Sequence, residues 1–111
     1  MEENADTKDK IISYLKNEFG LDDNDISEML TEFCNNTESL INKAAEQFAQ
    51  GSFELLARTG HSIKGASANV GANVISGFGK NLELGAKENN KEECAKALES
   101  LKAEFENLRK S

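Results

Sequence analysis

Hydrophobic side chains recur along this chain at steps of three and four residues, the spacing that places them on one face of an α-helix. The longest series of this kind comprises Ile26, Leu30, Phe33, Thr37, Ile41, Ala44 and Phe48. Asp25, with Glu28 three residues later, has the form of a helix-capping pair, and Gly51 supplies a stop. The pattern therefore predicts a helix of about 25 residues, roughly 38 Å long.

The same spacing predicts four further helices. The first covers about residues 6–19 and ends before Gly20. The others begin after Ser52, after Gly71 and at Asn90, which forms a second capping pair with Glu93. In the first helix the residues expected to face the interior are Ile11, Ile12, Leu15 and Phe19. In the helix after Ser52 they are Phe53, Leu56, Gly60, Ile63, Ser67 and Val70, and in the helix after Gly71 they are Ile75, Phe78, Leu82 and Ala86. In the last helix they are Cys94, Leu98, Leu101, Phe105 and Leu108.

No strand pattern, internal repeat or linker interrupts these helices, and the chain contains no proline. Gly77, Gly79 and Gly85 weaken the fourth helix by about 1 kcal/mol each relative to alanine, so packing must hold it or the glycines must permit a close helix approach. Short connections make consecutive helices antiparallel neighbours. We therefore expect one all-α domain over residues 1–111, with a core from about 6 to 109. We expect it to form an antiparallel up-down-up-down four-helix bundle with an additional N-terminal helix.

The composition excludes several classes of protein. A net charge of −7 argues against nucleic acid as a partner. No apolar run approaches the roughly 20 residues of a membrane span, and the first residues are acidic rather than signal-like, so we expect a cytoplasmic protein without membrane insertion. Cys34 and Cys94 are interpreted as two reduced, packed thiols, and the presence of one histidine without a cysteine cluster argues against a structural zinc site.

The charge is unevenly distributed. Residues 58–87 carry Arg58, Lys64, Lys80 and Lys87 against the single acid Glu83, whereas acidic side chains outnumber basic ones on both sides of this stretch. The only histidine of the chain, His61, lies within it. At about 100° per residue, positions 61, 64, 65 and 68 share one helix face, just beyond the buried stripe. This face combines an imidazole, the ammonium group of Lys64 and open space at Gly65 and Ala68, which suits phosphoryl transfer between two proteins.

The run His61-Ser62-Ile63-Lys64-Gly65-Ala66-Ser67-Ala68-Asn69-Val70-Gly71-Ala72 resembles the signature of histidine-containing phosphotransfer (Hpt) domains. The resemblance extends over nearly the whole chain, because a long acidic helix precedes the run, Leu82-Glu83 follows it and a terminal helix closes the bundle. It implies that His61 is phosphorylated, that Lys64 supports the phosphate and that Gly65 leaves room for a partner. Arg58, Lys87 and Ala68 are candidates for docking that partner.

In such a reaction a neutral imidazole nitrogen attacks an aspartyl phosphate, and an ordinary histidine is largely neutral at cytosolic pH. The resemblance implies as partners the receiver domains of response regulators and a hybrid sensor histidine kinase. The sequence has no P-loop and no kinase glycine-rich loop, so we expect a phosphocarrier that is not itself a kinase. No cofactor is expected on this chain, and Mg²⁺ is expected on the receiver. We also expect a monomer.

Other interpretations remain open at this stage. A similar motif occurs in the phosphorylatable domain of chemotaxis-type histidine kinases, and a purely structural helical adaptor would not need His61 at all. An autonomous enzyme would need a second catalytic group near His61, for which the sequence offers no convincing candidate. We interpret Ser67 as structural, with its hydroxyl able to bond the carbonyl four residues back. Glu83 is interpreted as a surface acid, with orientation of the imidazole from the neighbouring helix as the alternative.

Overall fold

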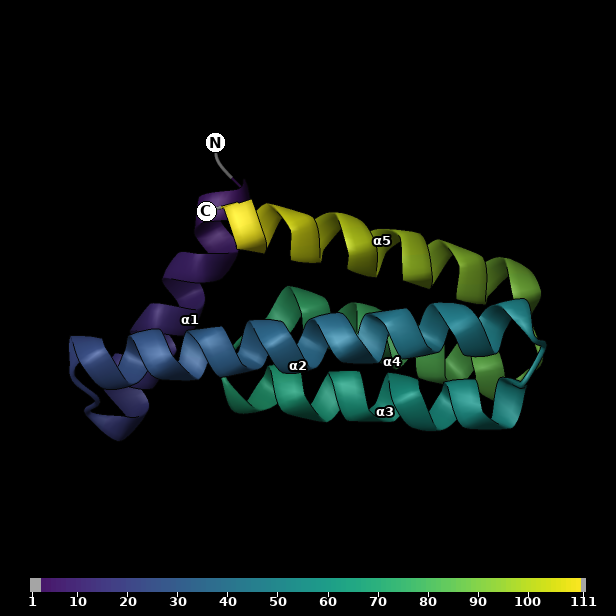
Figure 1. Ribbon diagram of the computed structural model, residues 1–111, viewed down its shortest axis with the longest axis horizontal. Helices are drawn as coiled ribbons and strands as arrows, with labels where there is room; N and C mark the ends of the chain where they lie inside the picture. Colours follow the sequence, from purple (N-terminus) through teal and green to yellow (C-terminus); the bar gives the residue numbers. More distant parts are fainter. Residues whose placement is uncertain (1–2, 111) are drawn as a thin grey trace.

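Five helices form the whole of the secondary structure in residues 3–110, the part of the chain that the computed structural model describes; side chains are described from residue 7. They are α1 (Glu3–Phe19), α2 (Asp23–Ala49), α3 (Phe53–Asn69), α4 (Asn73–Lys87) and α5 (Lys91–Lys110). Helices α2 to α5 run alternately up and down as a bundle, and α1 lies across one end of it, beside the end of α5 (Figure 1). The predicted fold class is confirmed.

The start of α2 differs from the prediction. The helix begins at Asp23, and the Oδ1 atom of Asp22 accepts the backbone N–H of Asp25 at 2.9 Å. Asp22 is therefore the cap, and the predicted pair of Asp25 with Glu28 is wrong, because Asp25 is already inside the first turn. Asp23 and Asp25 in that turn are favourable beside the positive end of the helix dipole.

The other caps follow the prediction in part. The Oδ1 atom of Asn90 accepts the backbone N–H of Glu93 at 3.1 Å, as expected for the start of α5. Ser52 occupies the N-cap position of α3, but its side chain makes no capping hydrogen bond. The turns that end the first four helices each contain a residue with positive φ, and these are Gly20, Gly51, Gly71 and Asn89. The predicted helix stops are thus correct, since few residues other than glycine and asparagine adopt this backbone conformation readily.

The core draws side chains from all five helices. Its largest fully buried members are Ile11, Leu15, Leu56, Ile63, Ile75, Leu82 and Leu101. Phe53 was expected inside but is only half-buried, at the edge of the core. Phe19 was also expected on the buried stripe of α1, yet its side chain is 57% exposed and packs edge-on against Tyr14, with ring centroids 5.9 Å apart. The stripe of α1 therefore ends at Leu15, because the last turn of the helix extends beyond the bundle.

Helices α3 and α4 make the most extensive contact of the fold. A methyl group added at Gly60 would lie 2.8 Å from the backbone nitrogen of Glu83, and one added at Gly79 would lie 2.8 Å from the backbone nitrogen of Lys64. The close helix approach considered for α4 is thus present at Gly79, and at Gly85 against α5, but Gly77 faces open space. Two glycines hold the backbones of α3 and α4 in direct contact beside position 61.

Candidate functional site

His61 stands on the edge of α3 that faces α4, with its side chain 65% exposed. The preceding residue, Gly60, belongs to the contact between the two helices, so the imidazole starts directly above that contact. Its Nδ1 atom lies 3.2 Å from the Oε2 atom of Glu83 on α4. One ring nitrogen is therefore engaged by the protein, while the ring as a whole remains accessible to a large molecule.

Glu83 is the residue that organises this site. Its side chain is only 10% exposed, so the interpretation of Glu83 as a surface acid is wrong. The reason is that Glu83 lies on the face of α4 directed at α3, where Gly60 permits the helices to touch. The Oε2 atom contacts His61 and, at 3.2 Å, the Nζ atom of Lys87; the Oε1 atom contacts the Nζ atom of Lys64 at 3.4 Å.

These contacts determine the ionisation of Glu83. Burial by itself raises the pKa of the carboxyl, but hydrogen bonds from Lys87, His61 and Lys64 together outweigh burial and lower the pKa below its ordinary value of 4.5. The group is consequently a carboxylate near neutral pH. Because a carboxylate can only accept hydrogen bonds, the contact with His61 assigns the proton to Nδ1 and leaves the lone pair of the neutral ring on Nε2.

Lys64 and Lys87 approach the carboxylate from different helices. Lys64 is half-buried, with 35% of its side chain exposed, whereas Lys87 is more exposed and pairs with Glu83 across one turn of α4. Two ammonium groups thus surround one carboxylate, which leaves an excess of positive charge beside the imidazole. The sequence placed Lys64 next to His61 by helical spacing, and the structure connects both to the same acid.

The next turn of α3 is open. Gly65 is exposed, and a methyl group added there would meet nothing within 4 Å; Ala68 is exposed one turn further on. Ser67 is fully buried, and its Oγ atom has no hydrogen-bond partner among the described residues, so the bond expected to a carbonyl four residues back is not formed. Ser76 was not predicted as a site residue; its Oγ atom donates to the carbonyl oxygen of Lys64 at 2.9 Å and connects α4 to α3 beside the site.

Comparison with known proteins decides the family. The family model of the Hpt domain matches residues 28–111, which include all of α3, α4 and α5 and most of α2. The chain belongs to the Hpt domain family. Hpt domains are phosphocarriers that act with receiver domains in two-component phosphorelays, so this chain has a histidine phosphotransfer role. Neither the curated proteins nor the solved structures gave a match.

A recess adjoins the histidine of this Hpt domain on the side toward the start of α3. It has a volume of about 390 Å³ and lies between the beginning of α3 and the end of α4. Its lining combines apolar and charged side chains, namely Phe53, Glu54, Ala57, Arg58, Ala86, Lys87 and Asn89. Arg58 is exposed and pairs with Glu54 at 3.7 Å. Since Lys87 belongs both to the recess and to the cluster around Glu83, the two features form one continuous surface.

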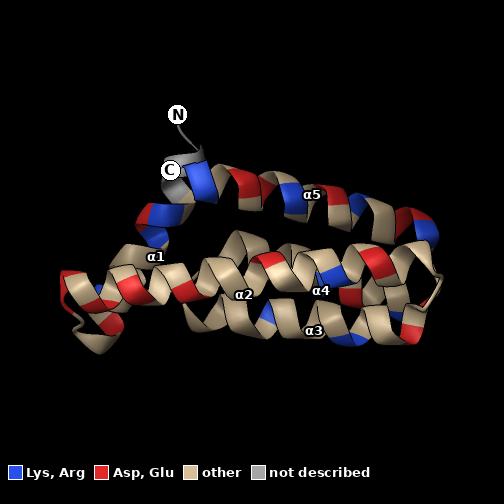
Figure 2. Ribbon diagram, in the orientation of Figure 1, with Lys and Arg blue, Asp and Glu red and all other residues tan. Residues whose placement is uncertain are grey.

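The charges of the Hpt domain differ between its faces. Helix α2 carries six acidic side chains and only one basic one, Lys43, and acidic positions recur along it in Figure 2. The basic side chains of the stretch from residue 58 to 87 lie on α3 and α4 instead. Of these side chains, Lys64 and Lys87 lie beside the imidazole, because both contact the carboxylate that His61 contacts.

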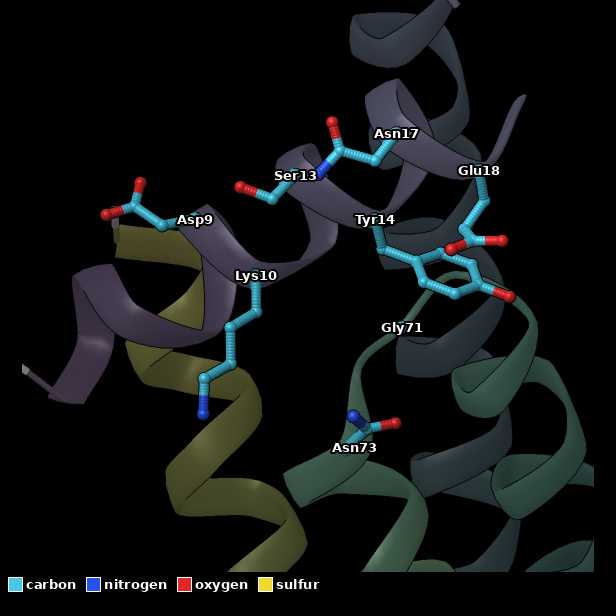
Figure 3. Close-up of a pocket in the computed structure, with 8 residues that line it drawn as sticks. All are labelled: Asp9, Lys10, Ser13, Tyr14, Asn17, Glu18, Gly71 and Asn73. Carbon is cyan, nitrogen blue, oxygen red and sulfur yellow. The ribbon is translucent and has the colours of Figure 1, made fainter. Parts of the chain in front are cut away.

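A second recess, of about 380 Å³, lies far from the histidine. It is formed by α1 and the turn between α3 and α4, where the ring of Tyr14 covers Gly71, and polar side chains such as Asn17 and Asn73 surround it (Figure 3). Gly71 follows His61 by ten residues, which corresponds to about 15 Å along a helix. This recess contains none of the predicted site residues.

Two further findings concern the described part of the Hpt domain. No helix within it has both the length and the apolar character needed to cross a membrane. Within the same residues, His, Cys, Asp and Glu side chains nowhere gather in groups of three or more that could hold a metal ion. Both thiols are free; burial raises the pKa of Cys34 and of Cys94.

Proposed function

We propose that His61 is the phosphorylated residue of this phosphotransfer protein and that its Nε2 atom is the nucleophile. The observation that carries the proposal is the 3.2 Å contact between Nδ1 of His61 and the buried carboxylate of Glu83. It holds the ring in one orientation and presents the Nε2 lone pair to the outside. An exposed imidazole fixed in this manner is prepared for attack on a group brought by another protein.

The proposed reaction begins with an aspartyl phosphate on a receiver domain. The Nε2 lone pair attacks the phosphorus atom, an N–P bond forms, and the bond from phosphorus to the aspartate oxygen breaks with release of the carboxylate. Lys64 and Lys87 stabilise the charge on the phosphoryl oxygens, because their ammonium groups already lie beside the imidazole. The same steps in reverse pass the group to an aspartate of another receiver. The Mg²⁺ ion is expected on the receiver, and no cofactor is needed on this chain.

The receiver is proposed to dock over the exposed face of α3. Gly65 and Ala68 leave this face flat on one side of His61, and the recess bordered by Arg58 and Lys87 lies on the other. The phosphorylation site of a receiver is acidic, so the basic rim of the recess complements it. The phosphate donor is proposed to be the receiver of a hybrid sensor kinase. The protein is expected to work as a cytoplasmic monomer.

The test is transfer to the wild-type protein and to His61→Gln. Glutamine keeps hydrogen-bonding bulk but has no nucleophilic nitrogen, so circular dichroism should show an unchanged bundle while phosphorylation is lost. Donors are the small molecule phosphoramidate and a radiolabelled phosphorylated receiver. The label on the wild type should be acid-labile and alkali-stable. Ser62→Ala, a change at the exposed neighbouring residue, serves as the control and should accept phosphate normally. Labelling of His61→Gln above background would contradict the proposal.

The identity of the partners requires a separate experiment. Transfer from the phosphorylated protein to every receiver domain of the source organism should reveal one or a few receivers that react within seconds and a larger number that react much more slowly. Starting the same assays from phosphorylated receivers shows whether phosphate flows mainly toward the response regulator or back to the kinase. Equal slow transfer to all receivers would speak against a dedicated phosphorelay partner.

A further inference from the structure

We propose that Glu83 keeps a proton on Nδ1 of His61 after Nε2 has been phosphorylated, so that the phosphoryl group is carried by a positively charged ring and stays easy to pass on. This inference rests on the proposed function, since it requires that His61 accepts the phosphoryl group. It assigns to Glu83 a part in the energetics of the phosphorylated state, beyond the orientation of the free imidazole.

The proton on Nδ1 matters because of electron balance in the ring. A neutral imidazole has one N–H group and one lone pair, and the lone pair of Nε2 becomes the N–P bond. If Nδ1 keeps its proton, the phosphorylated ring carries a positive charge, and breaking the N–P bond releases a neutral imidazole. If Nδ1 loses the proton to solvent, the same step must release an imidazolate anion, which is a far poorer leaving group. Retention of the proton therefore favours onward transfer.

Glu83 is placed to retain that proton. Its Oε2 atom lies 3.2 Å from Nδ1, and the carboxylate is largely shielded from water. Lys64 and Lys87 hold the two oxygens from different helices, and the backbone of Glu83 is fixed by the contact with Gly60. The carboxylate is thus stationary, and its charge stabilises a cationic ring at short range.

The charged groups around the ring come from the two helices that form the site. On α3 and α4 the ring faces Glu83, Lys64 and Lys87, while Arg58 one turn away is engaged by Glu54. Helix α2 packs on the other side of α3, where Gln47 bonds Thr59. The phosphoryl group on Nε2 adds negative charge on the other side of the ring, and together with the carboxylate it favours a positively charged ring over a neutral one.

The test measures proton binding to the phosphorylated ring. The full chain is phosphorylated with phosphoramidate, and the ring nitrogens are followed by ¹⁵N NMR as the pH is raised. In the wild type the midpoint of Nδ1 deprotonation should lie at least one pH unit above that of the same phosphorylated chain unfolded in urea, which means a tenfold stronger hold on the proton. Equal midpoints in the folded and unfolded chains would overturn the proposal without any mutation.

A variant pair isolates the charge of Glu83. Glu83→Gln can still accept a bond from Nδ1–H but is neutral, so its midpoint should fall by about one unit. Its transfer to a receiver should be about tenfold slower than that of the wild type at pH 8 and nearly equal at pH 6, where both rings are protonated. The control Glu88→Gln changes an exposed acid at the C-terminal end of the same helix and should leave the midpoint unchanged. A uniform slowing at both pH values, with no shift of the midpoint, would assign Glu83 a structural role only.

The two proposals fail in different ways. If phosphoramidate does not label His61 in the wild type, the proposed function is wrong and the question of the proton does not arise. If His61 is labelled but the midpoint of Nδ1 deprotonation is the same in the wild type and in Glu83→Gln, the proposed function stands and this inference is wrong.

Discussion

Gly60 on α3 and Gly79 on α4 face each other with no side chain between the two helices. A methyl group at either position would lie 3.1 Å from the carbonyl oxygen of the other and 2.8 Å from a backbone nitrogen of the opposite helix. This spacing brings Glu83 beneath His61, because the nitrogen that Gly60 approaches is that of Glu83 itself. The geometry of the site thus depends on two residues that carry no functional group.

A methyl group at Gly79 should therefore disturb both the fold and the reaction. Gly79→Ala would force α3 and α4 apart, since the atoms that it meets belong to the backbone, and we expect a loss of about 1–3 kcal/mol in the free energy of unfolding. Gly77→Ala, two residues earlier on the same helix, meets open space and should stabilise the bundle by up to about 1 kcal/mol. Urea unfolding followed by circular dichroism measures both. Equal effects of the two changes would show that the helices adjust freely.

A substitution at Gly65 should affect docking of the receiver without lowering the stability of the bundle. A Cβ atom at this position would meet nothing, so Gly65→Gln should leave the melting temperature unchanged or raise it slightly. The gain in helix stability is at most about 1 kcal/mol. The new side chain stands one turn from His61, where a receiver must approach. We expect transfer from a phosphorylated receiver to fall strongly, whereas labelling by phosphoramidate should change little. If transfer from both donors stays at the wild-type rate, the receiver does not dock over this turn.

Lys64 should contribute mainly to the rate of transfer. Removing its ammonium group in Lys64→Ala should slow transfer about 10- to 100-fold, equivalent to about 1.4–2.8 kcal/mol in the activation free energy. Because the side chain is half-buried against Glu83, a loss of up to about 1 kcal/mol of stability is also expected. Stopped-flow transfer and thermal unfolding give the two quantities. Lys102→Ala, an exposed change on α5, is the matched control and should affect neither. Transfer by Lys64→Ala at the wild-type rate would reduce Lys64 to a structural partner of Glu83.

The lowered pKa of Glu83 has a consequence for acid stability. A carboxyl with a lower pKa in the folded than in the unfolded chain stabilises the fold above its ordinary pKa of 4.5, and this stabilisation is lost as the pH falls below that value through the folded pKa. The drop in melting temperature between pH 7 and pH 3 should therefore be smaller for Glu83→Gln than for the wild type. Calorimetry at the two pH values measures it. An identical drop in both proteins would mean that the ion pairs of Glu83 contribute nothing to stability.

Most of the site residues that the sequence could predict lie on α3, and only Lys87 lies on α4. His61, Lys64 and Gly65 share a face of α3 by helical periodicity alone, and the glycine and asparagine turns located the helix ends. Glu83 could not be placed in this way, because its burial depends on how closely α4 crosses α3. One signal was available: Gly60 and Gly79 are both mid-helix glycines, a combination that favours close packing.

Capping chemistry was ambiguous for a similar reason. Asp22 and Asp25 both precede the apolar series of α2, and either can cap a helix. Only the backbone conformation decides between them, and it selects Asp22. Ser67 is a different case, because its position on a helix predicted a hydrogen bond from its hydroxyl to the carbonyl four residues back, and this bond is not formed.

Helix α1 lies before the matched residues of the family, yet it closes the core. Ile11 and Leu15 are fully buried, Thr7 donates a hydrogen bond to Glu104 of α5, and Tyr14 covers Gly71 in the turn after α3. A segment transplanted into another host protein from residue 28 onward would leave hydrophobic surface of the bundle open to water. The unit that could be moved intact between signalling proteins is therefore expected to start at α1, although the match to the family model starts only at residue 28.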